Sequence, residues 1–245
     1  MYPVLFRIAG IEITSFGVLM AIAMLVGIRL FARELARSRL PEDAVNAALA
    51  GALGGVVGAK LVWAIEFSGT EPFMDLLLSR GGFSWFGGFA GGAGTGLWML
   101  RRHGIPLVRG LAAATPALAV GHAIGRIGCF LVGDDYGRST DLPWGVAFPL
   151  GLPPTNAPVH PTQLYEAVLL APLALLLIRW RRRGVADAVV LGRYLVLAGL
   201  FRFTIEFVRV NRQIVGPLTL AQLLALGLMA AGWVMLMKTG KALRG

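Results

Sequence analysis

The sequence has too few charged residues for a water-soluble protein. Only 15% of its 245 residues are charged, whereas soluble domains carry about 25%. Hydrophobic residues make up 56% of the chain, and the mean hydropathy is +0.71. A soluble domain of this composition would expose large apolar areas to water. The composition therefore indicates a membrane protein.

Cysteine and histidine are also scarce. The single cysteine, Cys129, excludes an intramolecular disulfide. The three histidines lie far apart, and neither His-x-x-x-His nor Cys-x-x-Cys occurs, so we expect no metal site. Gly-x-Ser-x-Gly, the turn that carries the nucleophile of many esterases, is absent as well. The sequence thus has no motif of a zinc enzyme or of a serine hydrolase.

What the sequence does have is long apolar stretches, seven of them, each near the 17 to 25 residues that a bilayer requires. Backbone groups inside lipid must be hydrogen-bonded within their own segment, so each stretch is predicted to be a helix. We therefore expect an all-α polytopic membrane protein with about seven transmembrane helices, in one domain covering residues 1–245. The stretches are approximately residues 14–32, 43–65, 83–100, 110–131, 164–180, 188–208 and 218–237.

The net charge of +10 is a topology signal rather than a sign of nucleic-acid binding. Of the 23 basic residues, 14 lie in four clusters that alternate connections place on one side of the membrane. Cytoplasmic connections carry an excess of Lys and Arg, so we expect an external N-terminus, a cytoplasmic C-terminus and no nucleic-acid partner. The clusters are residues 29–39, 101–109, 179–183 and 238–244.

Glycine and proline mark two further regions. The second and third stretches contain glycines four residues apart, such as Gly54/Gly58 and Gly87/Gly91. This spacing lets helix backbones approach closely, so we interpret these glycines as packing residues. The longest connection, about residues 132–163, is expected on the external side and holds six prolines, which exclude a regular helix. Connections of this length are often functional.

Apart from the four clusters, four basic residues lie inside the predicted helices: Lys60, Arg126, Arg193 and Arg202. Placing such a cation in a membrane helix costs about 2.5 to 3.5 kcal/mol on insertion scales, so ionisable residues there are usually functional. Arg193 is close enough to the cytoplasmic end of its helix to reach water. The other three need partners or water inside the protein.

Two charged helix faces are predicted near the external ends of the fourth and sixth stretches. Glu206 alone can hardly neutralise both Arg126 and Arg202, and the surplus positive charge favours an anionic ligand such as a phosphate. The alternative is structural, with Glu206 pairing with Arg126 or Arg202 to hold helices together. The faces consist of His122, Arg126 and Cys129, and of Arg202, Glu206 and Arg209, at spacings of three and four residues.

A third polar motif, HPTQLYE, begins the fifth stretch at His160. Pro161 suits the first position of a helix, which leaves His160 just outside it. Gln163 and Glu166 then share one helix face. A histidine or tyrosine at a membrane boundary more often anchors the chain than catalyses a reaction, so His160 is a candidate with that alternative beside it.

Three segments together, GHAIGRIGCFLVGDDYGR, HPTQLYE and GLFRFTIEFVR, make the sequence resemble the bacterial prolipoprotein diacylglyceryl transferases. The similarity runs from PVLFRIAGIEITSFGVLM near the N-terminus to the seventh stretch. The resemblance implies transfer of a diacylglyceryl group from phosphatidylglycerol to the cysteine thiol of a prolipoprotein signal peptide. It also implies no cofactor or metal and a location in the bacterial cytoplasmic (inner) membrane.

The resemblance assigns roles to particular residues. Arg126 matches the signature arginine, Arg202 and Glu206 match the family's Phe-Arg-x-x-x-Glu, and Gly137 closes the signature. Arg126 and Arg202 would hold the lipid phosphate, with Glu206 orienting Arg202. With the predicted charged faces, this gives a catalytic set of Arg126, Arg202, Glu206 and His160, and a phosphatidylglycerol-binding set of Arg126, Cys129, Gly137, Phe86 and Arg209.

The sequence departs from the best-known branch of the family at three positions. Phe86 replaces a histidine, Phe16 a tyrosine and Cys129 an asparagine. Without the first two polar groups, several candidates remain for the base that deprotonates the thiol. The departures leave two alternatives open, a paralogue that binds lipid without transferring it and a non-enzymatic carrier. The base candidates are His122, His160, Asp134, Asp135 and Glu206.

Overall fold

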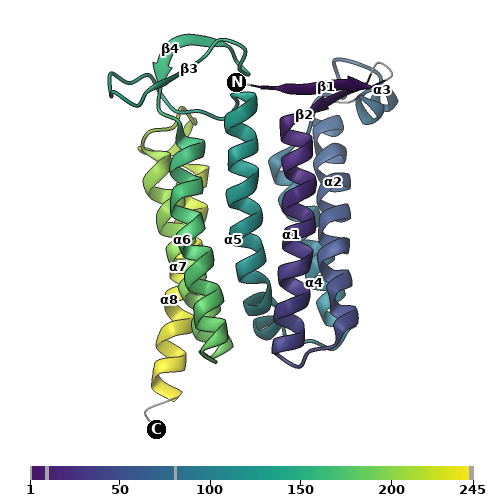
Figure 1. Ribbon diagram of the computed structural model, residues 1–245, viewed down its shortest axis with the longest axis vertical. Helices are drawn as coiled ribbons and strands as arrows, with labels where there is room; N and C mark the ends of the chain where they lie inside the picture. Colours follow the sequence, from purple (N-terminus) through teal and green to yellow (C-terminus); the bar gives the residue numbers. More distant parts are fainter. Residues whose placement is uncertain (1, 9–10, 80–81, 243–245) are drawn as a thin grey trace. The chain divides into compact units, whose positions relative to one another are not determined.

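The computed structural model describes residues 2–8, 11–79 and 82–242 and consists mainly of helices (Figure 1). A long helix occupies each of the seven predicted stretches. Arg244, the last residue of the fourth basic cluster, lies outside the described residues. The long helices are α1 (Ser15–Arg37), α2 (Asn46–Glu66), α4 (Trp85–Arg102), α5 (Leu107–Val132), α6 (Thr162–Arg182), α7 (Asp187–Glu206) and α8 (Leu220–Ala242).

Six helices in the described part of the chain are long and apolar enough to cross a membrane, so the protein is a multi-pass membrane protein. They are α1, α2 extended by the 3-10 turn η1 (Glu42–Val45), and α5 to α8. Helix α4 does not meet the same hydropathy criterion, because six of its 18 residues are glycine and two arginines end it. The short helix α3 (Phe73–Leu78) was not predicted.

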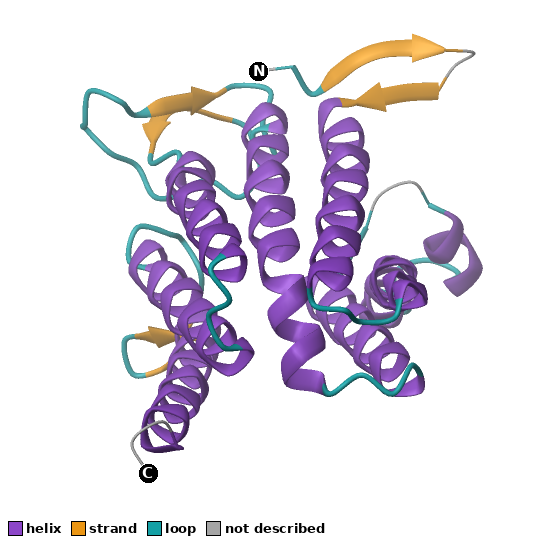
Figure 2. Ribbon diagram, turned by 60° about the horizontal axis from the view of Figure 1, so that its bottom comes forward, coloured by secondary structure: helices purple, strands orange, loops and turns teal. Residues whose placement is uncertain are grey.

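Short strands join several of the helix ends, which an all-α prediction omits (Figure 2). They form three antiparallel pairs, and β3 and β4 lie in the proline-rich connection between α5 and α6. No helix lies between Val132 and Thr162, so the prediction of a non-helical connection is confirmed. The pairs are β1 (Val4–Ile8) with β2 (Ile11–Thr14), β3 (Val146–Phe148) with β4 (Thr155–Val159), and β5 (Gln213–Val215) with β6 (Leu218–Thr219).

The chain divides into two compact units, residues 1–27 with 114–245, and residues 28–113. In the first unit, α5, α6 and α7 share an apolar core that includes Ala119, Leu173, Leu177 and Val190. Helices α7 and α8 approach so closely that a Cβ on Gly232 would lie 2.6 Å from the Gly192 carbonyl oxygen. This packing holds α5, α6, α7 and α8 together within the first unit.

In the second unit, α2 and α4 pack through their glycines. A Cβ on Gly91 would lie 2.2 Å from the carbonyl oxygen of Gly54, and one on Gly87 would lie 2.2 Å from that of Gly58. Such distances leave no room for a side chain, so the prediction that these glycines are packing residues is confirmed. The Thr95 hydroxyl reinforces the contact, since it donates to the carbonyl oxygen of Ala50 at 2.8 Å.

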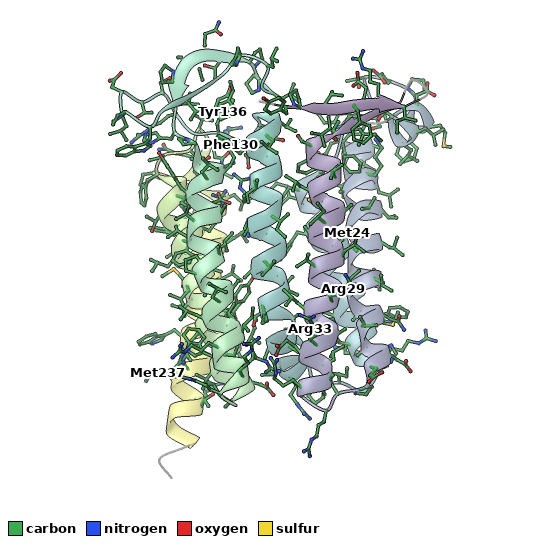
Figure 3. The ribbon with its side chains drawn as sticks, viewed as in Figure 1. Met24, Arg29, Arg33, Phe130, Tyr136 and Met237 are labelled. Carbon is green, nitrogen blue, oxygen red and sulfur yellow. The ribbon has the colours of Figure 1, made fainter. Side chains whose placement is uncertain are left out.

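The basic residues within the helices that lie outside the charged faces interact with different groups. Lys60 donates to the backbone and side-chain oxygens of Ser79, at 2.7 and 2.8 Å. Arg193 lies over the ring of Trp180, 4.8 Å from its centroid. Arg29 and Arg33 lie toward the end of α1 that is opposite β2, as Figure 3 shows.

Candidate active site

Three arginines and three carboxylates converge in the first unit, and we call them the arginine cluster. Helix α5 supplies one arginine, α6 a glutamate, and the last turn of α7 with the residues after it supplies the remaining arginines and a second glutamate. An aspartate comes from the connection that follows α5. The cluster consists of Arg126, Arg202, Arg209, Asp135, Glu166 and Glu206.

Glu166 is the centre of this cluster. Its Oε2 lies 2.9 Å from Arg126 Nε and 3.4 Å from His122 Nε2. Its Oε1 lies 3.6 Å from Arg209 Nη1 and 3.9 Å from Arg202 Nη1. The side chain is only 7% exposed, and a buried carboxylate needs such partners to remain ionised. One carboxylate thus joins residues of α5, α6 and α7.

Asp135 ties the connection after α5 to the same arginines. Arg126 Nη1 donates to its carboxylate at 2.5 Å, and Arg209 Nη2 donates to the other oxygen. Burial alone would raise the pKa of the Asp135 carboxyl, but Arg209 and Arg126 outweigh it and hold that pKa below its usual value. Thr162, at the start of α6, donates to the Asp135 backbone oxygen at 2.9 Å. These contacts hold the connection against the end of α5 and the start of α6.

Glu206 pairs with Arg202, its neighbour four residues earlier on α7. Its Oε2 lies 2.6 Å from Arg202 Nη1 and 3.6 Å from Arg209 Nε. Its Oε1 accepts hydrogen bonds from Asn211 Nδ2 at 2.8 Å and from Thr219 Oγ1 at 2.7 Å. The Glu206 side chain is fully buried, so both oxygens interact within the protein.

The cluster does not contain the expected surplus of positive charge. Its three arginines face three carboxylates, because Glu166 and Asp135 supply the negative charge that Glu206 alone could not. Of the two pairings in the structural alternative, Glu206 with Arg202 is present, whereas Arg126 pairs with Glu166 and Asp135 instead. The sequence placed the two arginine faces at one level but could not show that the start of α6 lies between them.

One donor group of the cluster nevertheless remains available to a ligand. Arg126 Nη2 is buried and makes no hydrogen bond within the part of the chain that the structure describes. Arg202 Nη1 and Arg209 Nε already face the Glu206 carboxylate. Unsatisfied buried guanidinium N–H groups are costly, and an anionic oxygen is the partner that satisfies them best. The geometry of the cluster therefore suits a phosphate group.

The remaining predicted residues surround the cluster to different degrees. The side chain of Cys129 is hydrogen-bonded to Asp134, whose pKa is raised by burial. A Cβ on Gly137 would lie 2.4 Å from the Val208 carbonyl oxygen, so only glycine permits this approach to the end of α7. Phe16 packs beside Gly128 of α5. Phe86 is an exposed residue of α4, in the second unit, and its place in the binding set stays a prediction.

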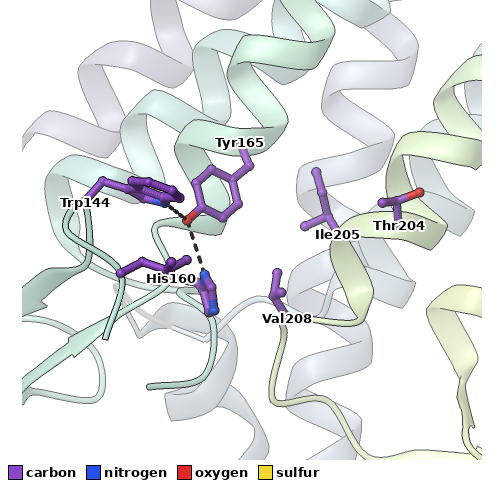
Figure 4. Close-up of a pocket in the computed structure, with 7 residues that line it drawn as sticks. Trp144, His160, Tyr165, Thr204, Ile205 and Val208 are labelled. Carbon is purple, nitrogen blue, oxygen red and sulfur yellow. Dashed lines mark hydrogen bonds between the residues drawn. The ribbon is translucent and has the colours of Figure 1, made fainter. Parts of the chain in front are cut away.

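His160 lies in a neighbouring pocket of about 430 Å³ rather than in the arginine cluster. Figure 4 shows the side chains of Trp144, His160 and Tyr165 opposite those of α7. The Tyr165 hydroxyl accepts from Trp144 Nε1 at 2.9 Å and lies 3.2 Å from His160 Nδ1. Burial and the nearby Arg138 lower the pKa of His160, which keeps the imidazole neutral near pH 7. The other lining residues are Leu142, Thr204, Ile205 and Val208.

The comparison with known families agrees with the three motifs. Residues 3–238 match the model of the family described as prolipoprotein diacylglyceryl transferase. The chain belongs to this family. The match includes every residue of the arginine cluster as well as His160.

Relatives of similar length share about a third of the sequence. A phosphatidylglycerol–prolipoprotein diacylglyceryl transferase of Geobacter sulfurreducens is 33% identical over 247 residues, which cover 95% of this chain and 93% of the relative. The protein of that name from Nitratidesulfovibrio vulgaris is 32% identical over 95% of this chain and 93% of its own. That of Clostridium tetani is 32% identical over 85% of this chain and 86% of its own.

Proposed function

We propose that this protein transfers the diacylglyceryl group of phosphatidylglycerol to the cysteine thiol of a prolipoprotein signal peptide. The observation that carries the proposal is the arginine cluster, in which three guanidinium groups meet and Arg126 Nη2 is left as a buried donor for an anionic ligand. Membership of the family supports the same reaction, since the curated relatives carry its name.

The proposal places the whole chain, residues 1–245, as one domain in the bacterial cytoplasmic membrane. Helix α4 is the seventh membrane helix, although its glycines lower its hydropathy. The N-terminus and the arginine cluster face the external side, and the four basic clusters face the cytoplasm. The external leaflet is also where a secreted prolipoprotein arrives.

In the proposed reaction, the thiolate sulfur attacks a glyceryl carbon and the bond from that carbon to the phosphate oxygen breaks. A carbon–sulfur bond forms, and glycerol phosphate leaves with the electrons of the broken bond. Negative charge therefore grows on the phosphate, where Arg126 and Arg202 stabilise it more strongly than in the bound lipid. Arg209 adds a third guanidinium, and Gly137 and Cys129 shape the site beside it.

A base must take the thiol proton, because a free cysteine has a pKa near 8.5. We assign this role to His160, which is neutral near pH 7 and is held by Tyr165. His122 is the second candidate, since it is half exposed and lies 3.4 Å from Glu166 in the cluster. Replacing each histidine by glutamine separates the two candidates. Without the true base, only the fraction of thiol that is already ionised at the assay pH can react, so the rate of that variant alone should rise steeply with pH.

The test is transfer by purified protein in detergent, from labelled phosphatidylglycerol to a peptide that carries the signal-peptide cysteine. The proposal expects a thioether product and release of glycerol phosphate in equal amounts. If the protein binds phosphatidylglycerol but forms no thioether, it is a lipid-binding paralogue and the proposal is wrong. If it neither binds nor transfers, the phosphate assignment fails too.

A further inference from the structure

Helix α8 begins with a reciprocal pair of hydrogen bonds. Thr219 and Gln222 form a capping box, the pattern Thr-x-x-Gln at a helix start. The Thr219 hydroxyl accepts from the Gln222 backbone N–H at 3.3 Å, and Gln222 Oε1 accepts from the Thr219 backbone N–H at 3.1 Å. Both side chains are buried, with 6% and 2% of the residue exposed. This arrangement alone would be a structural cap.

The Thr219 hydroxyl has a second use that the cap does not require. A hydroxyl can donate one hydrogen bond while it accepts others. Here it donates to Glu206 Oε1 at 2.7 Å, across to the last residue of α7. Asn211 Nδ2, from the connection that leads to β5, donates to the same oxygen at 2.8 Å.

These two donors hold Glu206 Oε1 and thereby determine that Oε2 is the oxygen that faces the arginines. With Oε1 held on one side, Oε2 is left 2.6 Å from Arg202 Nη1. Arg202 is about a third exposed, so without a fixed carboxylate its long side chain has freedom to turn. The start of α8 therefore sets the position of Arg202, although no residue of α8 belongs to the arginine cluster.

We propose that Thr219, together with Asn211, is a positioning residue of the transfer reaction that acts through Glu206 on Arg202. This inference rests on the proposed function. Arg202 is one of the two arginines that stabilise the negative charge growing on the leaving phosphate, so a displaced Arg202 slows the chemical step more than it weakens lipid binding.

Three variants separate positioning from capping. Thr219→Val keeps the shape of the side chain but loses the hydrogen bond to Glu206 and the cap bond from the Gln222 backbone N–H. We expect kcat to fall about tenfold, the size of one hydrogen bond to a charged group, with KM for phosphatidylglycerol changed much less. Thr219→Ser keeps the hydroxyl and restores the rate. Gln222→Ala removes only the return bond of the cap, so it lowers the melting temperature in detergent while kcat stays within about twofold.

A double variant tests the route through Arg202. In an Arg202→Lys background, Thr219→Val should add little, because the side chain that it positions has already been replaced. Asn211→Ala, which does not touch the start of α8, should lower kcat in the same direction by a smaller factor. It carries the test if Thr219→Val does not fold.

The inference is overturned if Thr219→Val has the wild-type kcat, or if Gln222→Ala loses as much kcat as Thr219→Val. Full additivity of Thr219→Val with Arg202→Lys would overturn it as well. These outcomes differ from a failure of the proposed function, in which the wild-type protein itself forms no thioether.

Discussion

Two helix contacts in this protein are close for opposite reasons. Between α2 and α4, glycines remove side chains so that the backbones can meet. Between α5, α6 and α7, charged side chains meet around Glu166 and are buried at considerable cost. The first contact joins helices in lipid by close backbone packing and buries no charge. The second buries charged side chains, which carries a large desolvation penalty. A cluster that packing does not require is best explained by function.

Glu166→Gln should have the largest effect on stability. Removing one partner of a buried ion pair typically costs about 3 to 5 kcal/mol, and Glu166 faces three arginines as well as His122. The expected result is a clearly lower melting temperature in detergent together with loss of transfer. The matched control is Glu12→Gln, whose exposed pair with Arg7 should contribute little. Equal melting temperatures for the two variants would remove Glu166 from the centre of the cluster.

Arg126→Ala should reduce transfer by about 100-fold or more, the typical loss for a group that stabilises transition-state charge. Arg126→Lys should recover part of the rate, since a lysine keeps the charge but not the paired donors. Initial rates of thioether formation measure both. The control is Arg193→Ala, which changes an arginine that lies over Trp180 instead of in the cluster. A rate for Arg126→Ala near that of Arg193→Ala would contradict the assignment.

The packing contact should respond to a single methyl group. Gly91→Ala places a Cβ 2.2 Å from the Gly54 oxygen, so we expect about 1 to 3 kcal/mol of destabilisation. Gly94, three residues later on α4, has no atom within 4 Å of such a Cβ. Gly94→Ala should therefore be neutral or slightly stabilising. Thermal unfolding in detergent distinguishes them, and equal stability would show that α2 and α4 are not in close contact.

The smallest effects should come from two neighbouring aspartates with opposite pH dependence. The lowered pKa of Asp135 means that its stabilising contribution is present above about pH 3.9 and is lost as the pH falls through the lowered value. The raised pKa of Asp134 means that the folded state binds its proton more readily, so stability falls as the pH rises above about 3.9 through the raised value.

At pH 7, Asp135→Asn should therefore lower the melting temperature, whereas Asp134→Asn should keep or raise it. Melting temperatures from pH 7 down to about pH 3, which lies below the usual pKa of an aspartate, test this pair. Shifts of the same sign in both variants would mean that burial, rather than Arg126 and Arg209, dominates at Asp135.

The helices were predictable because apolar length alone determines them, and each of the seven stretches became a helix. The glycine contact was predictable for a similar reason, since spacing of four residues places Gly54 and Gly58 on one face. The ion pairs were not predictable, because they depend on which helices are neighbours. Glu166 appeared in the sequence only as one polar residue at a helix start, although HPTQLYE provided the signal.

The candidate active site was also predictable only in part, because its geometry depends on which segments are neighbours. The three motifs identified Arg126, Arg202 and Glu206, and the structure brings these residues together. Spacing could not reveal that His160 faces a separate pocket, because the connection between α5 and α6 folds back through β3 and β4. Local periodicity describes one helix at a time, whereas the site is built from four segments.

The central claim is that the arginine cluster binds the phosphate of the lipid. The most direct measurement is the amount of phosphatidylglycerol retained by purified protein, determined by native mass spectrometry for the wild type, Arg126→Ala and Arg193→Ala. The account predicts that the wild type and Arg193→Ala retain the lipid and that Arg126→Ala loses most of it. Retention by Arg126→Ala equal to that of the wild type would contradict the claim.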